Sequence, residues 1–290
     1  MQSNDSTLLS PAQAARALGL SESSVRRLCD QGALESLRTE GGHRRIRPTA
    51  VAAYARATTS AVSAEQARAA AGQGGRVAGE SELVKRTTKA LIEGDAGLLR
   101  RLLSELSLAG ESAAYVADRV LTPALRELGQ RWCEGELAVY QEHRASEILL
   151  SCLARAREAH APTARARRAV CAAPAGDPNS IASAMAAWVL AELGYAAVTL
   201  GANMPFGGLA EAVRELRPQL LVLSVSHVLD ASSCQLHCRE LYDLTSELGC
   251  GLALGGRALT PALRAGLSAD FFGETLSHLA DHARKRRAVK

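Results

Sequence analysis

Aromatic residues make up only 3% of this 290-residue chain, and several other features are scarce. The longest apolar stretch, residues 220–225, is far shorter than the roughly 20 residues that span a bilayer. The seven cysteines are scattered without a C-x-x-C pair, and no signal-like apolar segment follows Met1. The sequence therefore predicts a protein of the reducing cytoplasm with no membrane partner.

Apolar residues, in contrast, make up 47% of the chain, which is enough for real hydrophobic cores. The length fits one large domain or two to three small ones. The net charge of +4 is too small to indicate nucleic acid binding by itself. Residues 16–56, however, contain eight arginines and four acidic residues, so a local charge of +4 lies in this one segment.

The pattern over residues 8–57 predicts three short helices with a hairpin between the second and third. The first helix spans residues 11–18, and Ser21 can cap a second helix that runs to Gln31. Residues 34–39 and 44–47 then flank the sequence E-G-G-H, whose paired glycines suit a tight hairpin turn. This arrangement is typical of a helix-turn-helix followed by a wing.

Basic side chains cluster on the predicted second helix and wing, where phosphate contacts would supply sequence-independent affinity for DNA. A solvated basic surface is the plainer interpretation of a few arginines, but the ordered cap, turn and wing favour DNA binding. The expected groove contacts are Ser23, Ser24 and Arg27. The expected phosphate contacts are Arg26, Arg27, Arg38, His43, Arg44 and Arg45.

The segments S-P-A-Q-A-A-R-A-L-G-L-S-E-S-S-V-R-R-L-C-D-Q-G-A-L and R-T-E-G-G-H-R-R-I resemble the winged-helix head of the MerR family. The resemblance covers about the first fifty residues and implies a double-stranded DNA operator as partner. We place this head at residues 1–57. Residues 58–79 are rich in Ala, Ser, Gln and Gly and predict a linker.

Helical periodicity follows over residues 80–93, 96–108, 111–131 and 136–160, with short glycine-containing breaks between the segments. Such connections favour an antiparallel four-helix bundle, assigned to residues 80–161. Pro123 lies inside the third segment and should kink it.

After residue 162 short β-rich runs alternate with helical stretches. Strands are expected at 168–173, 196–200, 220–224 and 251–254, and helices at 181–193, 209–216, 232–248 and 260–266. This alternation predicts a Rossmann-like, doubly wound parallel sheet over residues 162–290. Ligands in such sheets bind beyond the carboxyl ends of the strands, here residues 176–180, 201–205, 224–227 and 255–256. The fold class is therefore multidomain α/β.

Trp132 and the pair Glu142-His143 stand close in sequence on two predicted helices, so both can face one cavity. A tryptophan at a helix end is, taken alone, more often part of a core. From Glu80 onward the chain resembles the helical cap and Rossmann-like module that binds cobalamin. With its head, the whole chain resembles the CarH/LitR class of light-responsive, B12-dependent repressors.

This resemblance implies specific cofactor contacts. Trp132, Glu142 and His143 would cover the upper face of the corrin and its adenosyl group. Ser224, with Ser226 beside it, and the pair Gly255-Gly256 would accommodate the nucleotide tail, since glycine lets backbone approach a ligand closely.

Two positions depart from the class. The loop after the first strand normally carries a histidine that binds cobalt from below, whereas this chain reads Asp177-Pro178-Asn179. The class usually also has a histidine directly after the bundle tryptophan, which traps cobalt after photolysis, and here that residue is Cys133. An amide is a poor substitute for imidazole. We expect altered axial ligation at Asn179, and a response to light that is absent or reversible in the dark.

Three functions fit these patterns. The first is a DNA-binding transcriptional regulator, a repressor, whose sensor binds cobalamin or a related tetrapyrrole and controls homo-oligomerisation on tandem operator sites. The second is a regulator whose sensor has lost the corrinoid and only mediates oligomerisation or partner docking, or has taken haem instead. The third, a corrinoid methyl carrier, is disfavoured because a DNA-binding head has no place in it. We expect no enzymatic activity.

Two further clusters are interpreted as structural. The spacing C-x-x-x-C of Cys234 and Cys238, with His237 between them, lacks the usual pairing of zinc ligands, so we assign no metal. The basic residues 284–287 and Lys290 are expected to form a solvated helix end.

Overall fold

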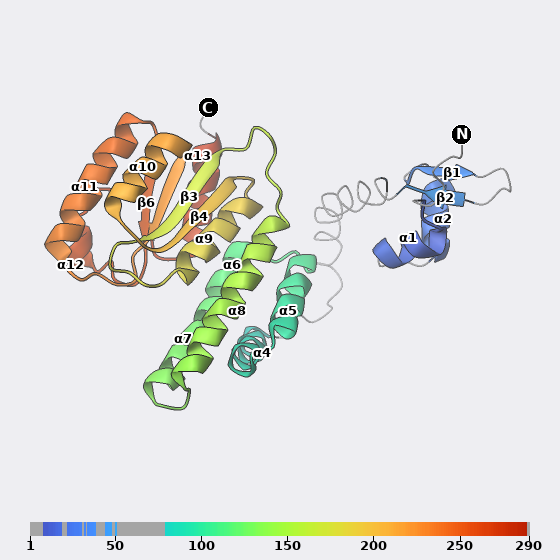
Figure 1. The fold of residues 1–290 in the computed structure, drawn as a ribbon, viewed down its shortest axis with the longest axis horizontal. Coiled ribbons are helices and arrows are strands. Elements are labelled where there is room, and N and C mark those ends of the chain that lie inside the picture. Colours follow the sequence, from blue (N-terminus) through green and yellow to red (C-terminus); the bar gives the residue numbers. More distant parts are fainter. Residues whose placement is uncertain are drawn as a thin grey trace. The chain divides into compact units, whose positions relative to one another are not determined.

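The computed structural model describes residues 8–18, 22–30, 32, 34–38, 44–47, 50 and 79–288. The chain divides into two compact units, residues 1–75 and 76–290 (Figure 1). The predicted wing turn at 40–43 and the predicted linker, apart from Gly79, lie outside the described residues.

The head unit contains α1 (Pro11–Leu18), α2 (Glu22–Asp30), β1 (Ser36–Arg38) and β2 (Arg44–Ile46) in its described part. Helix α1 begins after a reciprocal cap, in which the Ser10 amide donates to the Gln13 side chain and the Gln13 amide donates to the Ser10 hydroxyl. The strands pair antiparallel, with Ser36 opposite Ile46. A small core holds helices and hairpin together, and its buried members are Ala14, Ala15, Val25, Leu34 and Ile46. The two predicted helices and the pairing of the two predicted strands are confirmed. The turn at residues 19–21, the Ser21 cap and most of the expected third helix lie outside the described residues.

The second unit begins with a helical bundle, α4 (Glu80–Glu93), α5 (Ala96–Leu108), α6 (Ala113–Val116), η2 (Ala117–Leu121), α7 (Thr122–Cys133) and α8 (Val139–Glu158). The predicted third helix is interrupted by η2, a π-helical turn that directly precedes Pro123. Because proline has no amide hydrogen, the wider turn accommodates the missing helical bond. The helix is thus irregular beside Pro123, and the kink itself stays a prediction.

Helix α8 starts three residues later than predicted. Gly135 takes a left-handed conformation with φ of 77°, which ends the run from α7. The Ala138 amide then donates to the Gln141 side chain at 2.9 Å, so the helix begins at Val139. Glu136 and Leu137 consequently belong to the α7–α8 connection. We call residues 132–143, which include this connection and the adjoining helix ends, the bundle hairpin.

A five-stranded parallel sheet follows, formed by β3 (Arg168–Pro174), β4 (Ala196–Met204), β5 (Leu220–Ser224), β6 (Gly251–Gly255) and β7 (Phe271–Gly273). The strand order is β4-β3-β5-β6-β7. The connecting helices are α9 (Ile181–Glu192), α10 (Phe206–Leu216), α11 (Ala231–Glu247), α12 (Pro261–Arg264) and α13 (Leu276–Ala288). Figure 1 shows α10 and α11 on one face of the sheet and α9 and α13 on the other. The predicted doubly wound α/β fold is confirmed.

Two predictions about the sheet were wrong. Strand β4 continues to Met204, although residues 201–205 were expected to be a loop, because Gly201 at φ of 79° absorbs a register shift against β3 without ending the pairing. Strand β7 was not predicted, since three residues with only Phe271 and Phe272 as apolar signal are too few to show a period.

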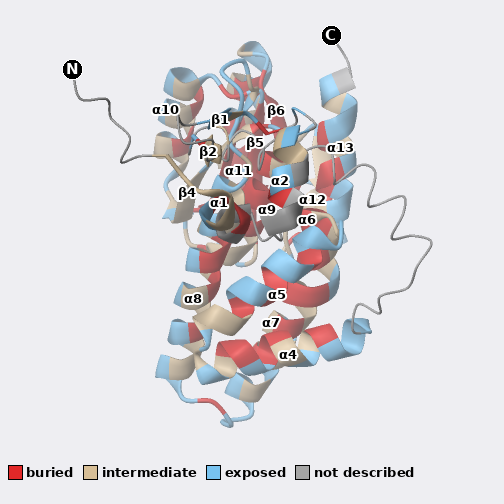
Figure 2. Ribbon diagram, turned by 90° about the vertical axis from the view of Figure 1, so that its right-hand side faces the viewer, coloured by how far each residue is buried: buried red, intermediate tan, exposed pale blue. Residues whose placement is uncertain are grey.

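The bundle shares a hydrophobic core with helices α9 and α13 of the sheet domain. Helix α9 is apolar on all sides, because it lies between the sheet and the bundle helix α8. Trp188 and Val189 of α9 belong to the same buried cluster as Leu149 and Leu153 of α8. Figure 2 shows buried residues both in the bundle helices and in the elements of the sheet domain. The division between 161 and 162 thus stays a prediction from sequence alone.

The basic end of α13 is more than a solvated surface. The Arg287 guanidinium donates to the carbonyl of Leu193 at the end of α9. The Arg167 side chain donates to the Arg286 carbonyl at 2.5 Å. The predicted solvated helix end is exposed at Arg284, Lys285 and Arg287, and the arginine contacts are additional to it, since an arginine can satisfy a free helical carbonyl. Lys290 lies outside the described residues.

Candidate functional site

The order in which successive strands are added to the sheet reverses between β3 and β5. The chain leaves β3 through α9 towards β4 on one side, and leaves β5 through α11 towards β6 on the other. The loops that follow these strands, residues 175–180 and 225–230, therefore meet at the carboxyl edge of the sheet. Crevices at such switch points are where open α/β sheets bind their ligands.

Asp177 joins these two loops. Its carboxylate is fully buried and accepts hydrogen bonds from the Ser226 amide at 2.5 Å, the Ser226 hydroxyl at 2.7 Å and the His227 amide at 3.2 Å. It also accepts from the Asn179 amide at 3.0 Å. A buried carboxylate requires such donors. Ser226, predicted to contact the cofactor, therefore uses both its amide and its hydroxyl inside the protein.

Asp177 was not among the predicted site residues. The available signal was an acidic residue directly after a buried strand, at the predicted switch point. Its partner Ser226 follows a different strand 49 positions away, and no local pattern indicates that pairing.

Asn179 also bonds within the chain. Its side-chain oxygen accepts from the Ile181 amide at 3.0 Å, at the start of α9. This bond is a local cap of the helix. The role of Asn179 as a cofactor-binding residue stays a prediction.

The paired glycines have a structural reason that the sequence analysis missed. A Cβ atom added to Gly256 would lie 2.2 Å from the Val225 carbonyl oxygen, and Gly256 has φ of 121°. A Cβ on Gly255 would lie 3.1 Å from the Gly273 carbonyl. Ser224, the buried last residue of β5, pairs with Gly255. The close approach that requires glycine is therefore to neighbouring backbone of the protein itself.

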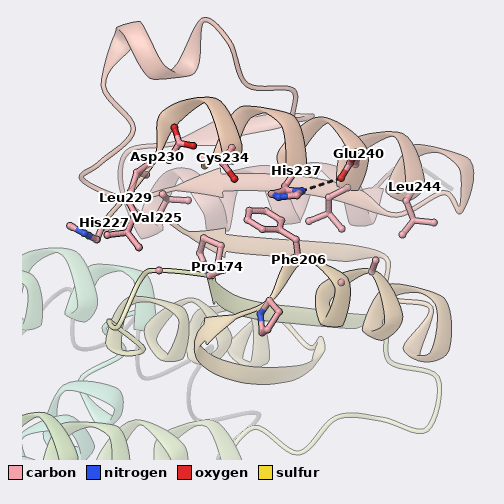
Figure 3. Close-up of a pocket in the computed structure, with 18 of the residues that line it drawn as sticks. Pro174, Phe206, Val225, His227, Leu229, Asp230, Cys234, His237, Glu240 and Leu244 are labelled. Atoms are coloured by element: carbon pink, nitrogen blue, oxygen red, sulfur yellow. Dashed lines mark hydrogen bonds and ion pairs between the residues drawn. The ribbon is translucent and has the colours of Figure 1, made fainter.

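A cavity of about 610 Å³ opens between α10 and α11 beside these loops (Figure 3). Its wall includes the Phe206 and His237 rings, which stack with centroids 5.1 Å apart. His237 is also bonded to Glu240 at 3.1 Å. The cavity does not include the predicted cofactor residues, namely Trp132, Glu142, His143, Asn179, Ser224, Ser226, Gly255 and Gly256.

Cys234 lies in the same cavity wall. A hydrogen bond from the Cys238 thiol lowers the pKa of Cys234 to about 7, although burial opposes this change. The same bond and burial raise the pKa of Cys238. Among the residues that the structure describes, no three His, Cys, Asp or Glu side chains are arranged to hold a metal ion.

The bundle hairpin brings the other predicted residues together. Trp132 lies at the end of α7 with 46% of its surface exposed, and Tyr140, in the first turn of α8, is 65% exposed. Glu142 accepts a hydrogen bond from Ser146 at 2.9 Å and lies 3.8 Å from the His143 ring. These side chains lie at one helix–helix connection, and Trp132 and His143 are exposed there. Their role above a cofactor stays a prediction.

In the head, Arg44 has an intramolecular role. Its guanidinium donates to the Asp30 carboxylate at 2.5 Å and to the Arg26 carbonyl at 2.9 Å, which fastens the wing strand to α2. The Arg44 hydrogen bond holds the pKa of Asp30 below its usual value, and that bond raises the pKa of Arg44. These bonds were not predicted, because Asp30 and Arg26 lie 14 and 18 positions from Arg44 in the sequence.

The other predicted DNA contacts are placed only in part. Arg26 and Arg38 are exposed and Arg45 is half-buried, with its guanidinium donating to the Arg44 carbonyl at 3.2 Å. His43 and the side chains of Ser23, Ser24 and Arg27 lie outside the described residues.

Two family models match the chain. A helix-turn-helix domain matches residues 8–59, and a B12 binding domain matches residues 83–157, which form the bundle α4–α8. These matches confirm the resemblance on which the predicted head and cap were based.

Curated relatives agree with both matches. The chain is 36% identical over 107 residues to the HTH-type transcriptional repressor CarH of Myxococcus xanthus, covering 37% of this chain and 36% of the repressor. It is 32% identical over 133 residues to the repressor CarA of the same organism, covering 46% and 43%. The aligned segments thus span less than half of each repressor.

A solved structure supports the fold of the second unit. The monomethylamine corrinoid protein of Methanosarcina barkeri aligns over 71% of this chain and 99% of its own, with a TM-score of 0.54 and 17% identity. The likeness extends over bundle and sheet together. No helix in the described part of the chain is long and apolar enough to cross a membrane.

Proposed function

We propose that this chain is a DNA-binding transcriptional regulator, a repressor, whose second unit binds a cobalamin and thereby controls assembly on DNA. The observation that carries the proposal is the presence of a helix-turn-helix domain and a B12 binding domain in one chain. We place the protein in the cytoplasm and assign it no enzymatic activity.

The residues of the second unit fit a large, partly apolar ligand. The bundle hairpin exposes Trp132, Val139 and Tyr140, and several exposed apolar side chains on one short segment favour a binding surface. Glu142 and His143 add hydrogen-bonding groups beside them. At the sheet edge, Asp177 holds two loops in place. A bound alkylcobalamin would supply a cobalt–carbon bond that light can break.

Self-association would connect this sensor to DNA binding. A single winged-helix head makes few base contacts, so its occupancy of one half-site is limited. Joining several heads through their sensor units raises the effective concentration at tandem half-sites. We therefore assign the second unit a role in a homo-oligomer whose formation depends on the ligand.

A second candidate function is a regulator whose sensor binds no corrinoid, or binds another tetrapyrrole such as haem. The side-chain oxygen of Asn179 is used by the start of α9, and Cys133 stands where the resembled class has a histidine. A corrinoid methyl carrier is less favoured. The likeness to the monomethylamine corrinoid protein concerns the fold alone, and the head has no part in that chemistry.

Parallel incubation of the full chain with adenosylcobalamin, methylcobalamin and haem, followed by gel filtration and visible absorption, tests the proposal. We expect a cobalamin to co-elute with the protein and to change its elution volume. A random-sequence duplex library then selects the operator, and the same cobalamin should change the affinity for it. Haem retention without cobalamin retention would favour the second candidate, and retention of neither would overturn the sensor assignment.

A further inference from the structure

His227 is the first residue after Ser226 in the loop that follows β5, at the carboxyl edge of the sheet. Its amide and the amide of Asn179 donate to the same carboxylate, that of Asp177, at 3.2 and 3.0 Å. The backbone amides at positions 227 and 179 therefore lie on the two oxygens of one carboxyl group. Positions 179 and 227, which are 48 residues apart in sequence, are thus brought to one carboxylate.

The His227 ring, unlike its backbone, is uncommitted. Within residues 79–288 the structure gives this ring no hydrogen bond, ion pair or ring contact, and the residue is exposed. His237, the other histidine at the cavity, is stacked on Phe206 and bonded to Glu240. Figure 3 shows His227 at the mouth of the cavity, with its ring directed away from the Phe206–His237 pair.

We propose that His227 supplies the protein's nitrogen ligand to the cobalt of the bound cobalamin, in place of the amide at position 179. The inference rests on the proposed function and identifies a metal-binding residue within it. Imidazole is a good ligand for first-row transition metals, whereas a neutral amide is a weak one. A fixed backbone with a free ring needs little reorganisation to bind.

The Asp177 contacts give the assignment its geometry. A ligand must be held in place before it binds, since ordering a mobile loop costs conformational entropy. The two bonds from Ser226 and the one from His227 supply that order from within the protein. Asp177 is accordingly a positioning residue, and His227 is the residue that touches the metal.

Electron paramagnetic resonance of the reduced, Co(II) form tests this directly. The full chain is produced with nitrogen-15 histidine and loaded with cob(II)alamin. An axial nitrogen-14 splits the cobalt lines into triplets, and an axial nitrogen-15 splits them into doublets. We expect doublets from the labelled protein. Triplets that persist after labelling would show that the cofactor's own base is the ligand, and would overturn the proposal.

The variant His227→Gln locates the nitrogen. We expect it to lose the doublets and to raise the dissociation constant for cob(II)alamin at least tenfold, while the thermal unfolding midpoint stays unchanged because the side chain is exposed. The matched variant His143→Gln, on the bundle hairpin, should keep the doublets. Doublets that survive in His227→Gln and vanish in His143→Gln would assign the ligand to the bundle and overturn the proposal.

The double variant His227→Gln with Asn179→His provides a rescue. Because positions 179 and 227 share one carboxylate, a histidine at 179 should restore the doublets. Wild-type protein that retains no cobalamin in gel filtration would instead refute the proposed function. That outcome differs from retained cobalamin without a histidine nitrogen, which refutes the His227 assignment alone.

Discussion

Two candidate surfaces, the carboxyl edge of the sheet and the bundle hairpin, differ in how much of their bonding is internal. At the sheet edge, the Ser226 hydroxyl and the Asn179 amide donate to Asp177, and the Asn179 side chain accepts from the Ile181 amide. At the bundle hairpin, Trp132 and Tyr140 expose about half or more of their surface. The first side is built before any ligand arrives, while the second keeps apolar surface in solvent.

This contrast assigns different tasks to the two sides. Internal hydrogen bonds stabilise the folded chain whether or not a ligand is present. Exposed apolar side chains contribute free energy of binding only when a ligand or partner removes their surface from water. Substitutions of the internally bonded residues Asp177 and Ser226 should therefore act mainly on stability, and substitutions at the hairpin mainly on affinity.

The strongest test of that contrast is Asp177→Ala. Because up to four donors lose their acceptor in a buried place, we expect the free energy of unfolding to fall by about 4 kcal/mol. Urea denaturation followed by circular dichroism measures it. The exposed residue Asp281 in α13 offers a control, and Asp281→Ala should cost under about 0.5 kcal/mol. A loss below about 1 kcal/mol for Asp177→Ala would contradict the role given to this carboxylate.

The next largest effect is expected at Gly256→Ala. The new Cβ would lie 2.2 Å from the Val225 carbonyl oxygen at a positive φ, so backbone must move. We expect a loss of about 3 kcal/mol in the same denaturation experiment. Gly129, inside α7 with open space around its Cβ position, is the matched control. Gly129→Ala should raise stability by about 0.5 kcal/mol, and equal effects at both positions would rule out the crowding argument.

The hairpin is tested by Trp132→Ala. The free energy of unfolding should change by less than about 1 kcal/mol, since nearly half of this side chain is already exposed. The dissociation constant for cobalamin, measured by gel filtration or isothermal titration, should rise about tenfold, which is about 1.4 kcal/mol. Leu108→Ala removes an exposed apolar residue from α5 and should leave the dissociation constant unchanged. Similar losses of affinity in both variants would mean that the hairpin is not special.

The head shows the same contrast on a smaller scale. Arg44 is bonded to Asp30 and α2, whereas Arg45 bonds only through the neighbouring Arg44 carbonyl in the described residues. Arg45→Ala should reduce the slope of log affinity against log salt by about 0.9, the value for one phosphate contact. Arg44→Ala should lower the unfolding temperature of the head and leave that slope nearly unchanged. Equal changes of slope in gel-shift titrations would restore Arg44 as a phosphate contact.

Local patterns predicted the elements well where the signal lies within a few residues. The glycine and proline breaks and the helical period placed α4, α5 and α11 within a residue or two of their observed bounds. Strand β5 was predicted with its observed ends. The start of α8 was missed because it depends on Gly135 and on the Gln141 side chain, which compete with an uninterrupted apolar period.

The site was predicted less completely than the fold. The resemblance to cobalamin-binding proteins indicated Trp132, Glu142, His143 and the loops after the strands. It did not indicate Asp177, nor the reason for Gly256. The contacts of Asp177 and Gly256 both depend on which loops of the sheet lie side by side. The strand order decides this, and no single segment of the sequence indicates it.

The sequence by itself thus determined the nature of the two units, a helix-turn-helix head and a cobalamin-type cap on a parallel sheet. Hydrophobic period, capping residues and turn glycines act over a few positions, so they can be recognised from the sequence. Only the tertiary structure decided that Ser226 and Arg44 bond within the protein, and that His227 stands beside position 179. These contacts join residues that are distant in sequence, and the packing of the sheet and of the head brings those residues together.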